Sequence, residues 1–368
     1  MIESQITRPT LLLDKAKCQS NIDTMLAKAK RTNTILRPHF KTHQSAEIGK
    51  WFKDKGVTAI AVSSLKMAEY FAANGWMDIT VAIPVNVREI DSINKLASKI
   101  ELNLVVESRE SILFLESELK DTVGIFIKVD SGYQRCGIPV EATESIRFLV
   151  GLIKDSEKMQ CKGFLAHTGQ NYNAKDQNEI HKNHSKALLN LNELKDVFRK
   201  EIPNLVVSLG DTPACSISEE FYGIDEIRPG NFVFYDVMQY VLGSCEEYQI
   251  AIAMACPVIA RNIDRNELVI YGGAVHFSKE YLEADEQGTK LFGSIVRITD
   301  NGWSEILGGA YLASVSQEHG IIRCSSDIFS SFQIGDLIGI LPIHSCLTAN
   351  LMRSYLSTDG NWVEMMPK

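Results

Sequence analysis

The sequence predicts an α/β protein in which a closed (β/α)8 barrel of the TIM type is followed by a mostly β domain. Eight strand-like runs alternate with amphipathic or polar helical segments in the first part of the chain, and such alternation predicts parallel strands joined by helices. At eight repeats the strands can close into a barrel. After Tyr240 the apolar runs are separated by Gly, Asn and Asp turn signals without long helical windows, which is typical of a β domain. An open doubly wound sheet is the alternative for the first part.

The first part of the chain carries local signals for its helices as well as for its strands. Asp14 is a helix N-cap candidate because apolar residues follow it on one helical face, and segment 65–73 ends at Asn74-Gly75, a C-cap signal. The predicted barrel strands are 34–36, 57–62, 78–83, 101–106, 123–129, 161–166, 205–208 and 224–228.

The predicted domain boundary lies where the helical windows stop. We expect the barrel over 14–240 and the β domain over 241–368, with residues 1–13 as an N-terminal strand that can join the β domain. The predicted strands of this domain are 250–254, 267–271, 291–298, 306–314 and 336–341.

Composition narrows the class of protein. The net charge is −8 and the isoelectric point is about 5.6, which argues against nucleic-acid or anionic-membrane partners. The N-terminus lacks the basic start and apolar core of a signal peptide, and no uncharged stretch reaches transmembrane length. The eight cysteines include no CxxC pair and are expected to be reduced thiols, mostly in the core. We therefore expect a cytoplasmic protein with no membrane partner.

Lys41 is the first candidate catalytic residue. It lies in Pro38-His39-Phe40-Lys41-Thr42-His43, just past the predicted strand 34–36, and the carboxyl ends of barrel strands are where chemistry is placed. A lysine that is buried and flanked by other cations loses its proton easily and can form a Schiff base. A solvated loop lysine is the other interpretation of this motif, and the rest of the chain has to decide between them.

Two short glycine-containing turns follow the last two predicted barrel strands. They are Gly210-Asp211-Thr212-Pro213 and Arg228-Pro229-Gly230-Asn231. Backbone amides and a threonine hydroxyl in such turns can bind phosphate, and the loops after strands 7 and 8 are its usual place in barrels. Together with Lys41 they predict a site for a phosphorylated aldehyde, and pyridoxal 5'-phosphate fits both ends.

The same motifs, in this order, resemble a known enzyme family. The hexapeptide around Lys41, Asp130-x-Gly132-x-x-Arg135-x-Gly137, Gly210-x-Thr212-Pro213 and the segment 227–236 are similar to the D-threonine aldolase and metal-dependent D-serine dehydratase family of alanine-racemase-like, fold-type III pyridoxal-phosphate enzymes. The resemblance covers nearly the whole chain. It implies a barrel with a β domain, a D-amino acid as the small-molecule substrate, and a homodimer with a shared active site.

The resemblance also implies roles for further residues of the barrel. Arg135 is expected near the phenolic oxygen of the cofactor and Arg228 near the ring nitrogen, while His167 and Tyr172 flank the ring. His39 shapes the surroundings of Lys41. The turns contribute Gly210, Thr212, Gly230 and Asn231 to the phosphate site.

A metal site is predicted at Pro342-Ile343-His344-Ser345-Cys346. On a strand, His344 and Cys346 would share one face because the side-chain period is two. Imidazole and thiolate suit a divalent metal, most of all Zn²⁺, with open positions for water or substrate. The resemblance implies the same, since the family holds a metal with His-x-Cys or His-x-Asp. His181 and His184 belong to a polar helical segment and are expected to be solvated.

The expected function is that of a pyridoxal-phosphate- and metal-dependent lyase. D-serine dehydratase, which forms pyruvate and ammonia, is favoured by Cys346 in place of aspartate. D-threonine aldolase is the alternative, followed by an amino-acid racemase and by a non-catalytic pyridoxal-phosphate-binding protein. The last of these lacks a β domain and a His-x-Cys. The roles of Glu318-His319 and of His276 stay open at this point.

Overall fold

The computed structural model describes residues 2–283, 285 and 287–367, and it divides the chain into two units. We call Asp23–Lys41 with Gly49–Gly230 the barrel unit, and Met1–Ile22 with Thr42–Ile48 and Asn231–Lys368 the β unit. The segment directly after Lys41 therefore belongs to the β unit. The predicted domains, 14–240 and 241–368, stay a prediction.

Eight parallel strands form the barrel. The eight strands pair side by side in the order β2-β10-β9-β8-β6-β5-β4-β3. A parallel bridge between His39 and Ala61 brings the chain after β2 against β3 and so joins the two ends of this order. The predicted TIM-like barrel is confirmed. The strands are β2 Ile35–Leu36, β3 Ala59–Val62, β4 Asp78–Pro84, β5 Glu101–Val106, β6 Val123–Asp130, β8 Met159–Ala166, β9 Val206–Leu209 and β10 Glu226–Ile227, and the short β7 Ile138–Pro139 pairs with β6.

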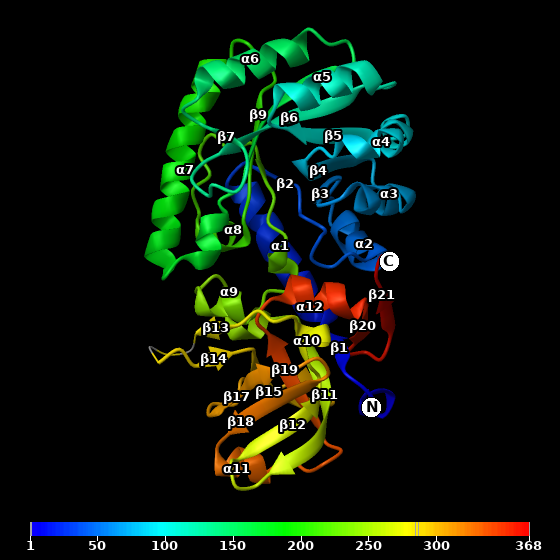
Figure 1. Ribbon diagram of the computed structural model, residues 1–368, viewed down its shortest axis with the longest axis vertical. Coiled ribbons are helices and arrows are strands. Elements are labelled where there is room, and N and C mark those ends of the chain that lie inside the picture. The colour runs from blue at the N-terminus through cyan, green and yellow to red at the C-terminus, as the bar shows by residue number, and fades with distance from the viewer. Residues whose placement is uncertain (1, 284, 286, 368) are drawn as a thin grey trace. The chain divides into compact units, whose positions relative to one another are not determined.

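Helices connect consecutive barrel strands, and Figure 1 shows α3 to α7 around the outside of the sheet. Side-chain caps define several of their N-termini, because Ser64, Ser108 and Asp176 each accept a backbone N–H from the first turn. The helices are α1 Lys15–Arg31, α2 Ala46–Asp54, α3 Leu65–Ala73, α4 Ile90–Ala97, α5 Arg109–Glu118, α6 Thr143–Lys154, α7 Gln177–Phe198 and α8 Thr212–Ile217.

A network of charged side chains connects four strands of the barrel. The Arg37 guanidinium donates to Glu226 Oε2 at 2.8 Å and to Asp78 Oδ1 at 2.6 Å. Although burial opposes it, these two carboxylates hold the Arg37 pKa above its ordinary value. Ser208 donates to the other Glu226 oxygen. Because every member has a partner, the network holds β2, β4, β9 and β10 together without leaving a buried charge unpaired.

The β unit is built on a ten-stranded, mostly antiparallel sheet. The N-terminal strand β1 pairs antiparallel with β11 and parallel with β20, so the two ends of the chain meet in one sheet. The described strands of this sheet are β1 Thr10–Leu13, β11 Ile252–Asn262, β12 Glu267–Tyr271, β15 Gly293–Thr299, β16 Gly302–Trp303, β17 Ala310–Val315, β18 His319–Cys324, β19 Leu337–Pro342, β20 Ser354–Ser357 and β21 Trp362–Glu364.

Shorter elements join the strands of the β unit and lead into it. They are α9 Val237–Val241, α10 Ala274–Phe277, the pair β13 Leu282–Glu283 and β14 Lys290–Leu291, α11 Ser326–Ser330 and α12 Ser345–Met352. Single turns of 3-10 helix occur at Glu3–Gln5, Val87–Glu89, Gly169–Asn173, Asn231–Val233 and Glu247–Gln249. None of the helices in the described part of the chain combines the length and the apolar character needed to cross a membrane.

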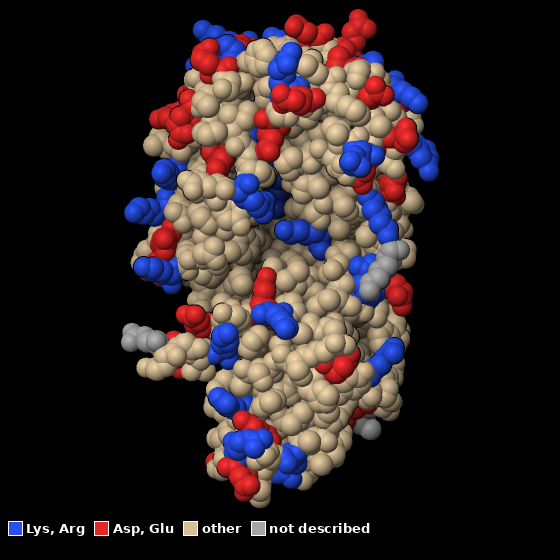
Figure 2. Space-filling model, in the orientation of Figure 1, with Lys and Arg blue, Asp and Glu red and all other residues tan. Residues whose placement is uncertain are grey.

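Many charged side chains lie at the surface, whereas one histidine of α7 is buried. Figure 2 shows acidic and basic side chains interspersed over the visible face. The prediction that His184 is solvated is wrong, because its side chain is buried, packs on the Phe221 ring and contacts the Glu220 carbonyl at 2.7 Å. His184 lies on the inner face of α7, whereas His181 is exposed.

Candidate active site

Lys41 follows the strand end that closes the barrel. Its backbone N–H donates to His39 Nδ1 at 3.3 Å, and the His39–Ala61 bridge anchors the segment to β3. Phe40 points into a cluster of aromatic rings, with the Phe71 and Trp76 centroids 4.9 and 5.1 Å away. Lys41 itself is exposed, so the expectation that it is buried is wrong. The packing holds the backbone that leads into Lys41, and the exposed side chain is accessible to a ligand.

Two histidines near Lys41 are held in the neutral form. Burial lowers the His39 pKa well below its ordinary value, and the positive charges of Lys41 and Arg228 act in the same direction. Burial also lowers the His167 pKa to about 3, although the Gly210 carbonyl, 2.5 Å from Nδ1, opposes the shift. Because a neutral imidazole that contacts a carbonyl through Nδ1 carries its proton there, the other nitrogen of His167 is left as an acceptor.

Two buried cations lie close to these histidines. Burial, followed by the charge of Arg228, lowers the Lys128 pKa to about 8, and burial lowers the Arg228 pKa to about 10. The Arg228 guanidinium donates to Ser208 Oγ and, at 2.6 Å, to the Ala166 carbonyl, which fixes its plane. Sequence reasoning assigned a role to Arg228 but none to Lys128. The available signal was a single lysine inside the otherwise apolar strand β6.

The loop after β6 brings a third cation to the cluster. Asp130 accepts the backbone N–H groups of residues 132–134 at 2.9 Å, which fixes the start of the loop. The Arg135 guanidinium lies 5.1 Å from the centroid of the Tyr133 ring, and this ring meets His167 edge to face at 5.7 Å. The structure therefore brings Arg135 and His167 together through Tyr133, a residue that sequence reasoning did not single out.

The loops after β8 and β9 also pack on one another. The Thr212 N–H donates to the Tyr172 hydroxyl at 3.2 Å, and the buried Asp211 accepts from Thr168 and from Asn171. At Gly210 a Cβ atom would lie 2.8 Å from the Arg228 backbone, so only glycine fits there. Gly210, Thr212 and Tyr172 are thus brought together, while their roles toward a cofactor stay a prediction.

The chemistry of this set fits an anionic aldehyde. Lys41, Lys128, Arg135 and Arg228 carry positive charge, and the nearby imidazoles are neutral. Burial opposes the charged forms of Lys128 and Arg228, and a phosphate with a phenolate would stabilise those charged forms. The exposed amine of Lys41 provides the nucleophile for an aldehyde. Pyridoxal phosphate carries all three groups.

His344 and Cys346 lie together in the β unit, although not as predicted. Strand β19 ends at Pro342, and His344 is the N-cap of α12, with Cys346 in the first turn of that helix. The strand prediction was wrong because the apolar run continues through Ile343, which is buried, beyond the last strand residue. The two side chains nevertheless form a hydrogen bond. Burial opposes the effect, but Cys346 and Glu280 raise the His344 pKa to about 11.

Polar side chains surround this pair within the β unit. Thr42 Oγ1 lies 3.2 Å and Asn231 Nδ2 3.7 Å from Cys346 Sγ. Glu280 Oε2 lies 2.6 Å from His344 Nδ1. The structure thus places the Asn231 side chain beside the pair, where it also donates to Ser345 Oγ at 2.9 Å.

The donor set fits a divalent metal that keeps open positions. In the described part of the chain no group of three or more His, Cys, Asp or Glu side chains has the arrangement of a metal site. A metal at His344 and Cys346 would therefore have two protein ligands, with water or substrate in the other positions. One imidazole and one thiolate are ligands that zinc favours.

The residues whose roles the sequence left open have local partners. His276 Nε2 lies 4.0 Å from Glu318 Oε2, and the Tyr271 ring meets the His276 ring edge to face at 5.7 Å. His319 is the first residue of β18 and pairs in register with Tyr271. Glu318 therefore precedes a strand and interacts with His276.

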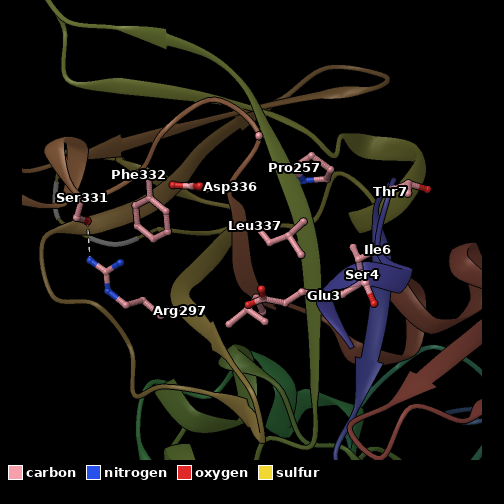
Figure 3. Close-up of a pocket in the computed structure, with 12 residues that line it drawn as sticks. Glu3, Ser4, Ile6, Thr7, Pro257, Arg297, Ser331, Phe332, Asp336 and Leu337 are labelled. Carbon is pink, nitrogen blue, oxygen red and sulfur yellow. Dashed lines mark hydrogen bonds between the residues drawn. The ribbon is translucent and has the colours of Figure 1, made fainter. Parts of the chain in front are cut away.

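A further cavity of about 690 Å³ lies within the β unit (Figure 3). Arg297 donates to Ser331 Oγ at 2.5 Å and stacks over Phe332, and the opposite side carries Glu3 and Leu337. None of the predicted site residues lines it. This cavity is therefore not part of the predicted cofactor or metal site.

Two protein families match the chain along its length. The family described as "Alanine racemase, N-terminal domain" matches residues 13–237. The chain belongs to this family. The family described as "Putative serine dehydratase domain" matches residues 251–358. The predicted relationship to alanine-racemase-like enzymes of the D-threonine aldolase and D-serine dehydratase type is confirmed.

Individual members of the family extend this result. A D-serine dehydratase from Dictyostelium discoideum is 28% identical, over 96% of this chain and 93% of its own length. The solved D-threo-3-hydroxyaspartate dehydratase from Delftia sp. HT23 is 25% identical, with a TM-score of 0.91 over 99% of this chain and 98% of that one. Its solved variants include a histidine-to-alanine replacement and, two positions further on, a cysteine-to-alanine replacement in the metal-free form.

A more distant structure defines the common fold. An alanine racemase from Clostridium difficile 630 has a TM-score of 0.68 at 14% identity, over 98% of both chains. At this identity the likeness concerns the fold alone. It agrees with the barrel and β domain seen here.

Proposed function

We propose that this protein is a pyridoxal-phosphate-dependent lyase that acts on D-β-hydroxy-α-amino acids, with the conversion of D-serine to pyruvate and ammonia as its main reaction. The observation that carries the proposal is the hydrogen-bonded pair of His344 and Cys346 in a chain whose barrel presents Lys41 at a strand end. The spacing of the pair equals that of the two residues replaced in the hydroxyaspartate dehydratase variants.

The barrel residues would hold the cofactor. Lys41 Nζ would bind its aldehyde carbon, and the turn containing Gly210 and Thr212 its phosphate, with Gly230 from the next strand end. Arg135 and Arg228 would place positive charge around the ring, and the hydrogen bond to the Ala166 carbonyl holds the Arg228 guanidinium in its orientation. Bound pyridoxal phosphate supplies an electron sink for negative charge at the substrate Cα.

Which proton is removed from the substrate decides between dehydration and aldol cleavage. In dehydration, the substrate amine would displace Lys41 from the cofactor aldehyde, and the freed Lys41 Nζ would take the Cα proton. The same proton would pass to the departing β-hydroxyl, which leaves as water. In the aldolase reaction, a base takes the hydroxyl proton and the bond between Cα and Cβ breaks. The neutral His39 and His167 do not compete as acids at neutral pH, since burial keeps their pKa values low.

His344 and Cys346 would hold a divalent metal, zinc by ligand preference. Such an ion supplies a Lewis acid for the β-hydroxyl, which is a poor leaving group without one. The ligand choice also supports a lyase over a racemase, since a racemase removes and returns a Cα proton and makes no use of a β-hydroxyl. A cytoplasmic homodimer with a shared site stays part of the proposal.

The decisive experiment is an assay of the purified, cofactor-loaded protein with D-serine and with D-threonine, before and after removal of metal by a chelator. We expect pyruvate and ammonia from D-serine, loss of activity with the chelator, and recovery on adding Zn²⁺. Glycine and acetaldehyde from D-threonine as the main products would replace dehydratase by aldolase. Racemisation without either set of products, or activity that survives complete metal removal, would contradict the proposal.

A further inference from the structure

We infer that Glu280 is a positioning residue that orients His344 for metal binding and sets the affinity of that site. The inference rests on the metal site of the proposed function. Glu280 is 64 residues from His344 in the chain, and its carboxylate Oε2 lies 2.6 Å from His344 Nδ1. Neither a motif nor a spacing in the sequence indicated it.

The contact determines which ring nitrogen can bind a metal. Since Glu280 occupies Nδ1, a metal held by His344 would have to bind Nε2. A carboxylate that accepts the Nδ1 proton fixes the tautomer and the ring orientation, and it makes the other nitrogen a stronger ligand. The His344 side chain is 28% exposed and that of Glu280 is 42% exposed, so the pair is only partly screened by solvent.

The backbone two residues before Glu280 has an energetically unfavourable conformation. Ser278 has φ +74° and ψ −174°, a conformation that glycine adopts readily and serine does not. Such a residue costs on the order of 1–3 kcal/mol and persists where the surrounding structure requires it. The Ser278 hydroxyl accepts the Glu280 N–H at 3.1 Å, so the unusual conformation directly orients the next residues.

The loop is also attached to the helix that carries the metal pair. Thr348 of α12 donates from Oγ1 to the Phe277 carbonyl at 3.4 Å. His344 is the N-cap of the same helix. This hydrogen bond ties the segment that leads to Glu280 to the helix that begins at His344.

The test measures metal affinity of the cofactor-loaded protein by competition with a chromophoric zinc chelator. Glu280→Ala should weaken zinc binding about 10- to 100-fold, the usual effect of removing a carboxylate behind a metal-bound histidine. Zinc binding should weaken less in Glu280→Gln, because the amide oxygen of glutamine can still accept the Nδ1 proton although it carries no charge. Glu283→Gln is the matched control, because it removes the same charge from the same segment. Glu283 is exposed and stands opposite Lys290 in the β13–β14 pair.

A spectroscopic readout separates orientation from general loss of structure. In cobalt-substituted protein the Cys346-to-metal charge-transfer band should persist in Glu280→Ala while the ligand-field bands shift, and the visible band of the lysine-bound cofactor should stay unchanged. Zinc affinity within twofold of wild type in Glu280→Ala, or an equal loss in Glu283→Gln, would overturn the role of Glu280 while leaving the metal site intact. A wild-type protein that binds no zinc would overturn both.

Discussion

Thr42 Oγ1 lies 3.2 Å from Cys346 Sγ, a contact between positions 304 residues apart. Thr42 is also the residue that follows Lys41. These two adjacent residues therefore belong to different units. Lys41 lies at the strand end of the barrel unit, and Thr42 belongs to the β unit that carries Cys346. The residue that follows the amine proposed to hold the cofactor therefore contacts a ligand of the proposed metal.

This contact leads to a first prediction. Thr42→Val removes the hydroxyl while keeping the shape, and it should weaken zinc binding about tenfold, because a hydrogen bond to a charged group is worth about 1.5 kcal/mol. Thr42→Ser keeps the hydroxyl and should bind zinc like the wild type. Chelator competition measures both, and equal affinities in the valine and serine variants would show that the contact does not matter.

Lys41 is predicted to be the residue that binds the cofactor. The purified protein should absorb in the visible region, and Lys41→Ala should lose that band because the exposed amine at the strand end is removed. Lys50→Ala is the control, since Lys50 is exposed on α2 and pairs with Asp54 at 2.6 Å. An absorption spectrum that is the same in Lys41→Ala as in the wild type would exclude this assignment.

Lys128 is predicted to lower the stability of the protein when no anion is bound. Its pKa is about 8 in the folded chain, because of burial, against an ordinary value of 10.5. Between these values the unfolded chain binds more protons, so this residue makes stability rise with pH from 8 to 10.5. Below pH 8 the full cost of about 3 kcal/mol is present.

Lys128→Met should therefore raise the free energy of unfolding at pH 7 by about 2–3 kcal/mol in protein without added cofactor, and the gain should shrink as the pH rises towards 10. Denaturant unfolding at several pH values measures the difference. Lys120→Met, at an exposed lysine, should show no such gain. A gain independent of pH would attribute the effect to packing instead of charge.

The protein is predicted to form a homodimer that completes the active site. Val275, Leu351 and Trp362 are exposed on the β unit and line one cavity of about 340 Å³. Exposed apolar side chains gathered at one place are typical of interaction surfaces. Sedimentation at low micromolar concentration should show a dimer, and we expect its interface to bury more than roughly 2,000 Å² in total. Full activity in a monomer at that concentration would refute a shared site.

The sequence by itself determined the eight-stranded barrel and the position of its lysine. Parallel barrel strands are buried on both faces, so each of them reads locally as an apolar run, and the alternation with helices leaves few topologies. The position of Lys41 after the run that ends at Leu36 follows from the same local pattern. The sequence also indicated His344 and Cys346 as a pair, because their spacing is a local property.

Only the tertiary structure decided which side chains meet. Local patterns report burial and backbone conformation, but they contain no record of which distant segments approach each other. His344 begins a helix although the apolar run continues through Ile343, and Glu280 reaches its ring from 64 residues away. The neutral state of His167 arises in the same way, since burial and the charges of Lys128, Lys41 and Arg135 act together only once separate strand ends converge in the folded barrel.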